Sequence, residues 1–169
     1  KKYDLRSLRM IISGGSAPPT SMIRAFEERH GLRLVQAWGM TELTPFGSVC
    51  NVPSRLATAS REESLAYRSM QGPPLPLVEF RAATDQGAAP WDGRTMGELE
   101  VRGPWVAASY YEAPEQQDRW TNDGWFRTGD VATMDADGYV KIVDRAKDMV
   151  KSGGEWISSV DLENTLMGH

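Results

Sequence analysis

Apolar and polar residues follow two different periodicities over the first fifty residues. Apolar side chains dominate residues 8–13 and alternate with polar ones over residues 32–38, which predicts two strands. Between them, apolar residues recur at helical spacing over residues 20–30, after two prolines and before Gly31, which predicts a helix. Strand, glycine-rich loop, helix and strand in this order predict an α/β unit.

The middle of the chain changes to short strands, because glycine, proline and aspartate interrupt its apolar runs. Two strands are predicted at residues 75–82 and 97–102. The Asp-Ala-Asp-Gly sequence at residues 135–138 predicts a hairpin turn between strands at 130–134 and 139–143. This part of the chain is therefore expected to be a β-rich subdomain.

The end of the chain predicts a hinge and the start of a further small domain. Residues 147–150 are predicted as a strand, 153–154 as a glycine loop, and 158–161 as a capping box that begins a final helix. The chain opens without methionine and stops inside this helical pattern, so we expect a fragment of a longer protein. The expected divisions are the end of an α/β domain at 1–60, the β-rich subdomain at 61–144 and the truncated C-terminal domain with its hinge at 145–169.

Composition and charge exclude several classes of protein. A net charge of -4 and a pI near 5.2 give no basic stripe for nucleic acid. A single cysteine rules out an internal disulfide framework, and two histidines form no zinc-ligand cluster. No apolar run reaches the ~20 residues of a membrane helix, and we expect a cytoplasmic protein. Cys50 is interpreted as a buried small hydrophobe rather than a reactive thiol.

The sequence SGGSAPP at residues 13–19 joins the first predicted strand to the predicted helix. Its glycines allow the backbone to approach a flat ligand, and the start of the helix offers free N–H groups. A plain structural turn explains the same residues, because such connections are common in α/β folds.

Residues 36–42, QAWGMTE, bring an aromatic ring, a glycine, a hydroxyl and a carboxylate together. The Trp38 indole can stack on a purine, and Thr41 can hydrogen-bond phosphate oxygens. Glu42 is a hard oxygen ligand suited to Mg²⁺. The alternative is a core tryptophan followed by a capped helix that begins at Thr41.

Two later segments add acidic and basic groups. The sequence DGWFRTGD at residues 123–130 ends in Asp130, whose two oxygens suit the vicinal hydroxyls of a ribose, as the acidic residue of dinucleotide folds does. The alternative is a turn carboxylate that caps nearby N–H groups. The sequence DRAKDMVKSGGEWIS at residues 144–158 places three cations ahead of a glycine pair. These cations suit a triphosphate and the glycines a narrow tunnel, or the cations belong to a solvated strand.

Taken in order, these segments resemble the adenylate-forming superfamily of acyl-CoA synthetases, luciferases and peptide-synthetase adenylation domains. The resemblance spans nearly the whole chain, and GEWISS at residues 154–159 is most similar to medium- and long-chain fatty-acid–CoA ligases. It implies a reaction in which a carboxylate attacks ATP to give acyl-AMP and pyrophosphate, and coenzyme A then displaces AMP. It also implies an α/β adenylate-binding domain, a distorted-barrel β subdomain and a small α+β lid.

The resemblance implies a role for each matching residue. Thr41 matches the phosphate-binding threonine, Glu42 the Mg²⁺ carboxylate and Asp130 the ribose ligand. The positions that match the nucleotide-binding strip and the segment before the phosphates are Gly15, Ser16, Ala17, Gln36, Trp38 and Gly39. Met40, Thr44 and Pro45 match positions that border the carboxylate end of the acyl group.

The resemblance also implies a lid that rotates between the two half-reactions. Its hinge matches Lys147, which joins Thr41 and Glu42 as an expected catalytic position, and Arg145 matches a position near the ribose. Further matches fall near the nucleotide and along the channel for coenzyme A, at Lys151 and Trp156 and at Gly153 and Gly154.

Two parts of the family's machinery lie outside this sequence. The phosphate loop that ends in lysine and the catalytic lysine of the lid are absent, so we expect the chain alone not to catalyse adenylation. The expected partners are a fatty acid or another carboxylate, ATP, Mg²⁺ and coenzyme A, with peripheral membrane contact left open. The alternatives are an adenylation domain or acyl-AMP ligase that serves a carrier protein, and a non-catalytic nucleotide-binding fragment. Acyl chain length and oligomeric state do not follow from the sequence.

Overall fold

The first sheet is the α/β unit that the sequence predicts. The computed structural model describes residues 3–56, 58–152, 155–157, 162 and 165–166. Strands β1 (Met10–Ser13) and β2 (Arg33–Gly39) run parallel, and helix α1 (Thr20–His30) connects them. Gly31 ends α1 in the left-handed conformation, with φ 64°, and its N–H donates to the Glu27 carbonyl.

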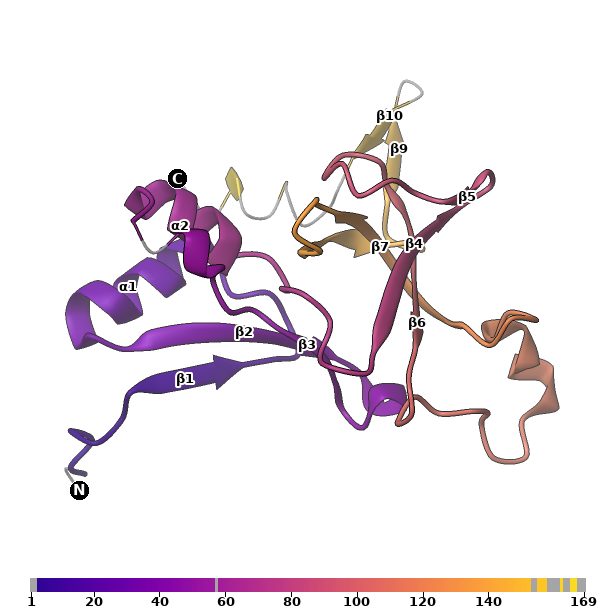
Figure 1. The fold of residues 1–169 in the computed structure, drawn as a ribbon, viewed down its shortest axis with the longest axis horizontal. Coiled ribbons are helices and arrows are strands. Elements are labelled where there is room, and N and C mark those ends of the chain that lie inside the picture. The colour runs from indigo at the N-terminus through magenta and orange to yellow at the C-terminus, as the bar shows by residue number, and fades with distance from the viewer. Residues whose placement is uncertain (1–2, 57, 153–154, 158–161, 163–164, 167–169) are drawn as a thin grey trace.

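A third strand and a second helix complete this unit (Figure 1). Strand β3 (Phe46–Val49) pairs antiparallel with β2, so the order is β1-β2-β3. Helix α2 (Arg61–Arg68) begins with a capping box between Ser60 and Glu63. Its Leu65 packs with Ile23 and Leu34, so α2 belongs with α1 rather than with the β-rich subdomain that the predicted division at residue 60 assigns it to.

The β-rich subdomain is an antiparallel sheet of five strands in the order β5-β4-β6-β7-β8. Its strands are β4 (Glu79–Thr84), β5 (Gly87–Ala88), β6 (Gly97–Arg102), β7 (Phe126–Met134) and β8 (Val140–Arg145). The predicted hairpin at residues 135–138 joins β7 to β8, and the predicted strand at 97–102 is β6. The strand predicted at 75–82 begins only at Glu79, because Val78 N–H closes a turn onto the Leu75 carbonyl.

The main core lies between the two sheets and joins them. Leu43 comes from a short 3-10 helix, η1 (Thr41–Leu43), that follows β2, and it is fully buried. It packs with β-sheet residues such as Leu99 and Phe126. Two isolated bridges, Ser48 to Pro74 and Gly72 to Val140, tie β3 to the edge strand β8. The end of β2 is therefore fixed against the second sheet.

After β8 the chain turns before a small hairpin. The strand predicted at residues 147–150 is wrong except at Val150. Residues 146–148 form a turn, because Asp148 and Met149 both donate their N–H groups to the Arg145 carbonyl. Strands β9 (Val150–Ser152) and β10 (Glu155–Ile157) then pair antiparallel. The predicted glycine loop at 153–154 and capping box at 158–161 lie outside the described residues. Two 3-10 helices, η2 (Ser54–Leu56) and η3 (Pro114–Arg119), lie in the connections.

Candidate functional site

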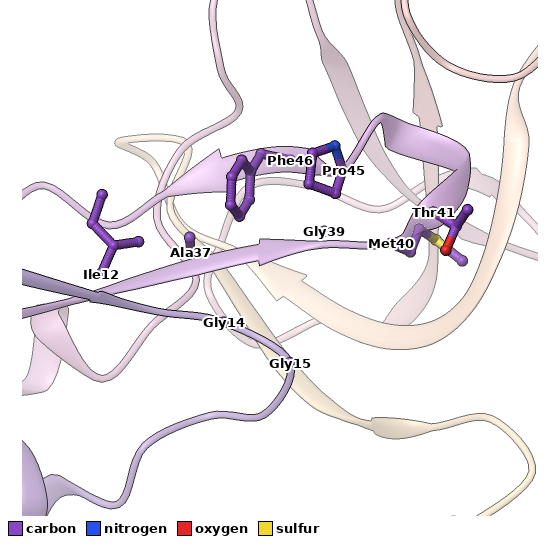
Figure 2. Close-up of a pocket in the computed structure, with 9 residues that line it drawn as sticks. All are labelled: Ile12, Gly14, Gly15, Ala37, Gly39, Met40, Thr41, Pro45 and Phe46. Atoms are coloured by element: carbon purple, nitrogen blue, oxygen red, sulfur yellow. The ribbon is translucent and has the colours of Figure 1, made fainter.

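A pocket of about 370 Å³ opens at the carboxyl ends of β1 and β2 (Figure 2). Parallel strands commonly bind ligands at this edge, and the volume lies in the range of small-molecule sites. Its lining comes from β1 and the loop after it, from the end of β2 and from the segment that leads into β3. The lining residues are Ile12, Gly14, Gly15, Ala37, Gly39, Met40, Thr41, Pro45 and Phe46.

Glycine is required at the end of β2 by the closeness of two backbone segments. A Cβ atom on Gly39 would lie 1.8 Å from the Pro45 carbonyl oxygen. The Met40 N–H donates to this same oxygen at 2.8 Å. Any side chain at position 39 would therefore push apart the two segments that form this wall of the pocket.

A second group of predicted residues meets on the other face of β2. The Trp38 Nε1–H donates to Asp130 Oδ2 at 3.0 Å, and Arg145 Nε lies 2.8 Å from Asp130 Oδ1. Asp130 and Arg145 are directly opposite each other on β7 and β8. The Trp38 ring also meets Phe80 edge-on, with ring centroids 5.4 Å apart. The end of β2 and the β7–β8 hairpin, which are far apart in the sequence, thus converge on one carboxylate.

The Asp130 carboxylate is almost enclosed, with 3% of the residue exposed. Burial raises the pKa of Asp130 above its ordinary value, while the Arg145 charge and the Trp38 hydrogen bond oppose that rise. Arg145 keeps half of its side chain in solvent, so the pair is buried only on the carboxylate side. The desolvation of Asp130 is therefore only partly offset by its partners.

Thr41 and Glu42 start the short helix η1, immediately beyond β2. Thr41 is exposed and lines the pocket. Glu42 is half-buried, and its carboxylate Oε1 accepts a hydrogen bond from the Tyr110 hydroxyl. Burial and the neighbouring Glu42 raise the pKa of Tyr110, which keeps the phenol protonated and able to donate. The alternative of a core tryptophan and a capped helix that begins at Thr41 is confirmed in part, because Trp38 packs against the main core and η1 begins at Thr41, but no side chain caps η1.

Three further predicted residues, Ser16, Ala17 and Gln36, do not line the pocket. Ser16 and Ala17 are exposed in the loop after Gly15. Gln36 is buried, and with its amide nitrogen facing the carbonyls it donates to Met70 and Ser69 while its oxygen accepts from the Gln71 side chain.

The predicted lid residues are described only in part. Lys147 is exposed in its turn. Lys151 and Trp156 are paired opposite each other in the β9–β10 hairpin. Gly153 and Gly154 lie outside the described residues.

Three residues of the site carry no signal that the sequence analysis used. Ile12 and Phe46 supply apolar surface to the pocket, and Tyr110 contacts Glu42 from a loop 68 positions away. The alternation of β1 places Ile12 on its exposed face, and Phe46 follows the Thr-Pro pair that borders the site. These patterns mark the two apolar positions, whereas the contact of Tyr110 depends on tertiary folding.

The described residues hold no cluster of three or more acidic, histidine or cysteine side chains that could bind a metal by itself. Glu42 offers one carboxylate beside the exposed Thr41 hydroxyl. Mg²⁺ is commonly bound by one or two carboxylates together with substrate phosphates, so this donor set fits Mg²⁺ that arrives with a nucleotide. None of the described helices has the length and apolar character needed to cross a membrane.

Comparison with known families identifies the chain. The family described as AMP-binding enzyme matches residues 1–111, which include the whole pocket, Glu42 and Tyr110. The chain belongs to the AMP-binding enzyme family. This match spans the motifs at residues 13–19 and 36–42 and confirms the resemblance to adenylate-forming enzymes.

Relatives within the AMP-binding enzymes are close in sequence. The chain is 48% identical over 169 residues to a long-chain-fatty-acid–CoA ligase of Thermus thermophilus, covering 99% of this chain and 31% of that protein. It is 46% identical over 165 residues to a medium-chain-fatty-acid–CoA ligase of Ectopseudomonas oleovorans, covering 97% of this chain and 30% of that protein. The chain thus spans about a third of the length of these relatives.

Solved structures of AMP-binding enzymes have the same fold over this region. The anthranilate CoA ligase AuaEII, in complex with anthranoyl-AMP, matches with a TM-score of 0.81 and 30% identity over 99% of this chain and 30% of its own. The o-succinylbenzoate CoA synthetase of Bacillus subtilis, in complex with ATP and magnesium ion, matches with a TM-score of 0.80 and 27% identity over 97% of this chain and 32% of its own. These matches confirm the expected fold class.

Proposed function

We propose that this chain is the adenylate-binding part of an ATP-dependent fatty-acyl-CoA ligase. The enzyme joins a carboxylate to AMP and then transfers the acyl group to coenzyme A. The observation that carries the proposal is the pocket at the carboxyl ends of β1 and β2, which Gly15, Gly39 and Thr41 line together from separate segments. The named activities of the two relatives described above support the fatty-acid class.

The pocket receives the junction between the acyl group and the phosphate. Its apolar side, with Ile12 and Phe46, suits the first carbons of a hydrocarbon chain, and the Thr41 hydroxyl donates to a phosphate oxygen. The loop from Gly15 to Ala17 offers exposed backbone to the base. Bound Mg²⁺ supplies charge neutralisation at the phosphates, and Glu42 is the residue that holds it.

Asp130 accepts the ribose hydroxyls, and Arg145 holds the carboxylate in place from the opposite strand. Each carboxylate oxygen has lone pairs beyond the one used by Trp38 or Arg145, so a hydroxyl can still donate to it. In the proposal, Trp38 acts on the nucleotide through its hydrogen bond to Asp130, which orients the carboxylate. Lys147 serves as the hinge, and Lys151, Trp156, Gly153 and Gly154 contribute to the lid. The proposal includes a role in lipid metabolism in the cytoplasm, with contact at a membrane surface for insoluble substrates.

The test uses the full-length protein that contains this chain. Pyrophosphate release should require a fatty acid together with ATP and Mg²⁺, and acyl-CoA should form when coenzyme A is added. Glu42→Gln keeps the shape of the side chain but loses its charge, so it should slow pyrophosphate release and raise the Mg²⁺ concentration needed for the half-maximal rate. Glu115→Gln, at an exposed glutamate of η3, is the matched control.

Two results would contradict the proposal in different ways. Pyrophosphate release that does not depend on any carboxylate would show that the proposed activation of an acid by ATP is wrong. An unchanged Mg²⁺ dependence in Glu42→Gln would remove only the assignment of Glu42 as a metal ligand.

An acceptor other than coenzyme A is the second candidate. An amide bond synthetase, McbA from Marinactinospora thermotolerans, matches with a TM-score of 0.80 and 33% identity over 98% of this chain. This region of the fold is therefore compatible with an enzyme whose product is an amide. Mass spectrometry of the products formed with coenzyme A and with amines distinguishes the two acceptors.

A further inference from the structure

Two hydrogen bonds from the loop that follows β6 hold Glu42 in place. The Ala107 N–H donates to the Glu42 carbonyl at 2.8 Å, and the Tyr110 hydroxyl donates to Glu42 Oε1. One loop therefore fixes both the backbone and the carboxylate of the same residue. The sequence separation of 68 positions makes this a tertiary contact rather than a local one.

The Tyr110 ring is itself anchored to the core. It meets the Trp120 ring edge-on, with centroids 5.3 Å apart and planes at 75°. The Trp120 Nε1–H donates to the Ala107 carbonyl at 2.8 Å, and the Trp120 ring contacts Phe126, which is fully buried. The phenol thus reaches Glu42 from a rigid support.

We propose that Tyr110 is a positioning residue for Glu42: its hydroxyl fixes the carboxylate so that the other oxygen, Oε2, is directed to a divalent cation. This inference rests on the proposed role of Glu42. A glutamate side chain loses rotamer freedom when it binds an ion, and a hydrogen bond that orders it beforehand lowers this entropic cost. The hydrogen bonds of the described residues use Oε1 and leave Oε2 for the cation.

A purely structural role for Tyr110 predicts different behaviour. Tyr110→Phe keeps the ring, and with it the edge-on contact to Trp120, and it leaves the backbone bond between Ala107 and Glu42 intact. The variant removes only the hydroxyl. If the tyrosine merely fastens the loop, its loss lowers stability without a specific effect on cation affinity.

The experiment measures cation binding directly in the full-length protein. Mn²⁺ replaces Mg²⁺, α,β-methylene ATP supplies the phosphates without reacting, and the electron paramagnetic resonance signal of free Mn²⁺ gives the affinity. Because one hydrogen bond is lost, we expect Tyr110→Phe to weaken Mn²⁺ binding about fivefold. Tyr111→Phe is the matched control, since Tyr111 is the adjacent tyrosine and is 89% exposed. It should bind Mn²⁺ as the parent does.

A double-mutant cycle with Glu42→Gln separates the positioning role of Tyr110 from the metal-binding role of Glu42. In the Glu42→Gln background, Tyr110→Phe should have no further effect on Mn²⁺ affinity. If Glu42→Gln weakens Mn²⁺ binding and Tyr110→Phe does not, the positioning role is wrong and the metal role of Glu42 stands. If neither weakens it, the role of Glu42 fails as well. An equal effect of Tyr110→Phe in both backgrounds overturns the inference, because its action would not pass through Glu42.

Discussion

Asp130 places a charge where little solvent reaches it. Its folded pKa is raised, so the protonated form is favoured in the folded state. The stability that this shift contributes is present below the ordinary pKa of an aspartate and is lost as the pH rises through the raised value. Above the raised pKa, the ionised carboxylate therefore makes the nucleotide-free fold less stable than the protonated form does. Groups with a perturbed pKa are often found at functional sites.

We predict that Asp130→Asn separates affinity from stability. The amide keeps the shape but weakens the contact with ribose hydroxyls, so AMP affinity should fall roughly ten- to a hundredfold, as for the loss of a charged hydrogen bond. The unfolding temperature at neutral pH should stay level or rise, because Arg145 is half exposed and can hydrate when its partner is neutral. Calorimetric titration with AMP and thermal unfolding check both effects. Unchanged AMP affinity would remove Asp130 from the ribose site.

The contacts of this residue show what the sequence could and could not predict. Trp38, Asp130 and Arg145 were each predicted from their own motifs, and the structure brings them together. The partners within the group could not be predicted, since the Trp38–Asp130 bond spans 92 positions and the Asp130–Arg145 pair depends on strand register. For the same reason the sequence analysis does not identify Tyr110.

The elements follow local signals where those signals are strong. The helix at residues 20–30 and the hairpin at 135–138 were predicted because proline, glycine and aspartate mark their ends. The sequence analysis does not predict helix α2, although Ser60 and Glu63 form a capping box. The helix is only eight residues long, and most of these residues are polar. The strand predicted at 147–150 is wrong over residues 147–149, because the Arg145 carbonyl closes a turn there.

The turn at residues 146–148 is where the proposed hinge lies, and it yields a prediction for Lys147→Pro. Proline fixes φ near -65° and restricts the preceding Ala146, so it opposes rotation of the segment. In the full-length protein, pyrophosphate release should largely persist while transfer of the acyl group to coenzyme A collapses. Single-turnover assays of each half-reaction measure the difference.

A matched control tests whether proline in any exposed turn has this effect. Asp85→Pro lies in the exposed turn between β4 and β5, away from the pocket, and should leave both half-reactions unchanged. Equal losses of the two half-reactions in Lys147→Pro, with the fold intact, would mean that Lys147 is not the pivot.

On the scale of the whole molecule, the site lies where the two sheets share a core. Leu43 follows Glu42 directly and inserts into the cluster formed by β4, β6 and β7. We predict that Leu43→Ala lowers the free energy of unfolding by roughly 2–5 kcal/mol, as expected for a large-to-small change at a fully buried position. Leu77→Ala, at a residue that is 76% exposed, should change it by less than about 0.5 kcal/mol. Chemical denaturation gives both values, and a similar small loss in each would contradict a shared core.

The two glycines that flank this junction have a consequence for protein engineering. A Cβ on Gly39 would meet the Pro45 carbonyl, and one on Gly47 would lie 2.4 Å from Leu43 and 2.7 Å from the Trp38 ring. Mutant libraries designed to change the range of accepted acids should therefore hold positions 39 and 47 constant. Such libraries should instead vary Ile12 and Phe46. The partly exposed side chains of these two residues line the pocket at the ends of β1 and β2 and can change size without moving the backbone.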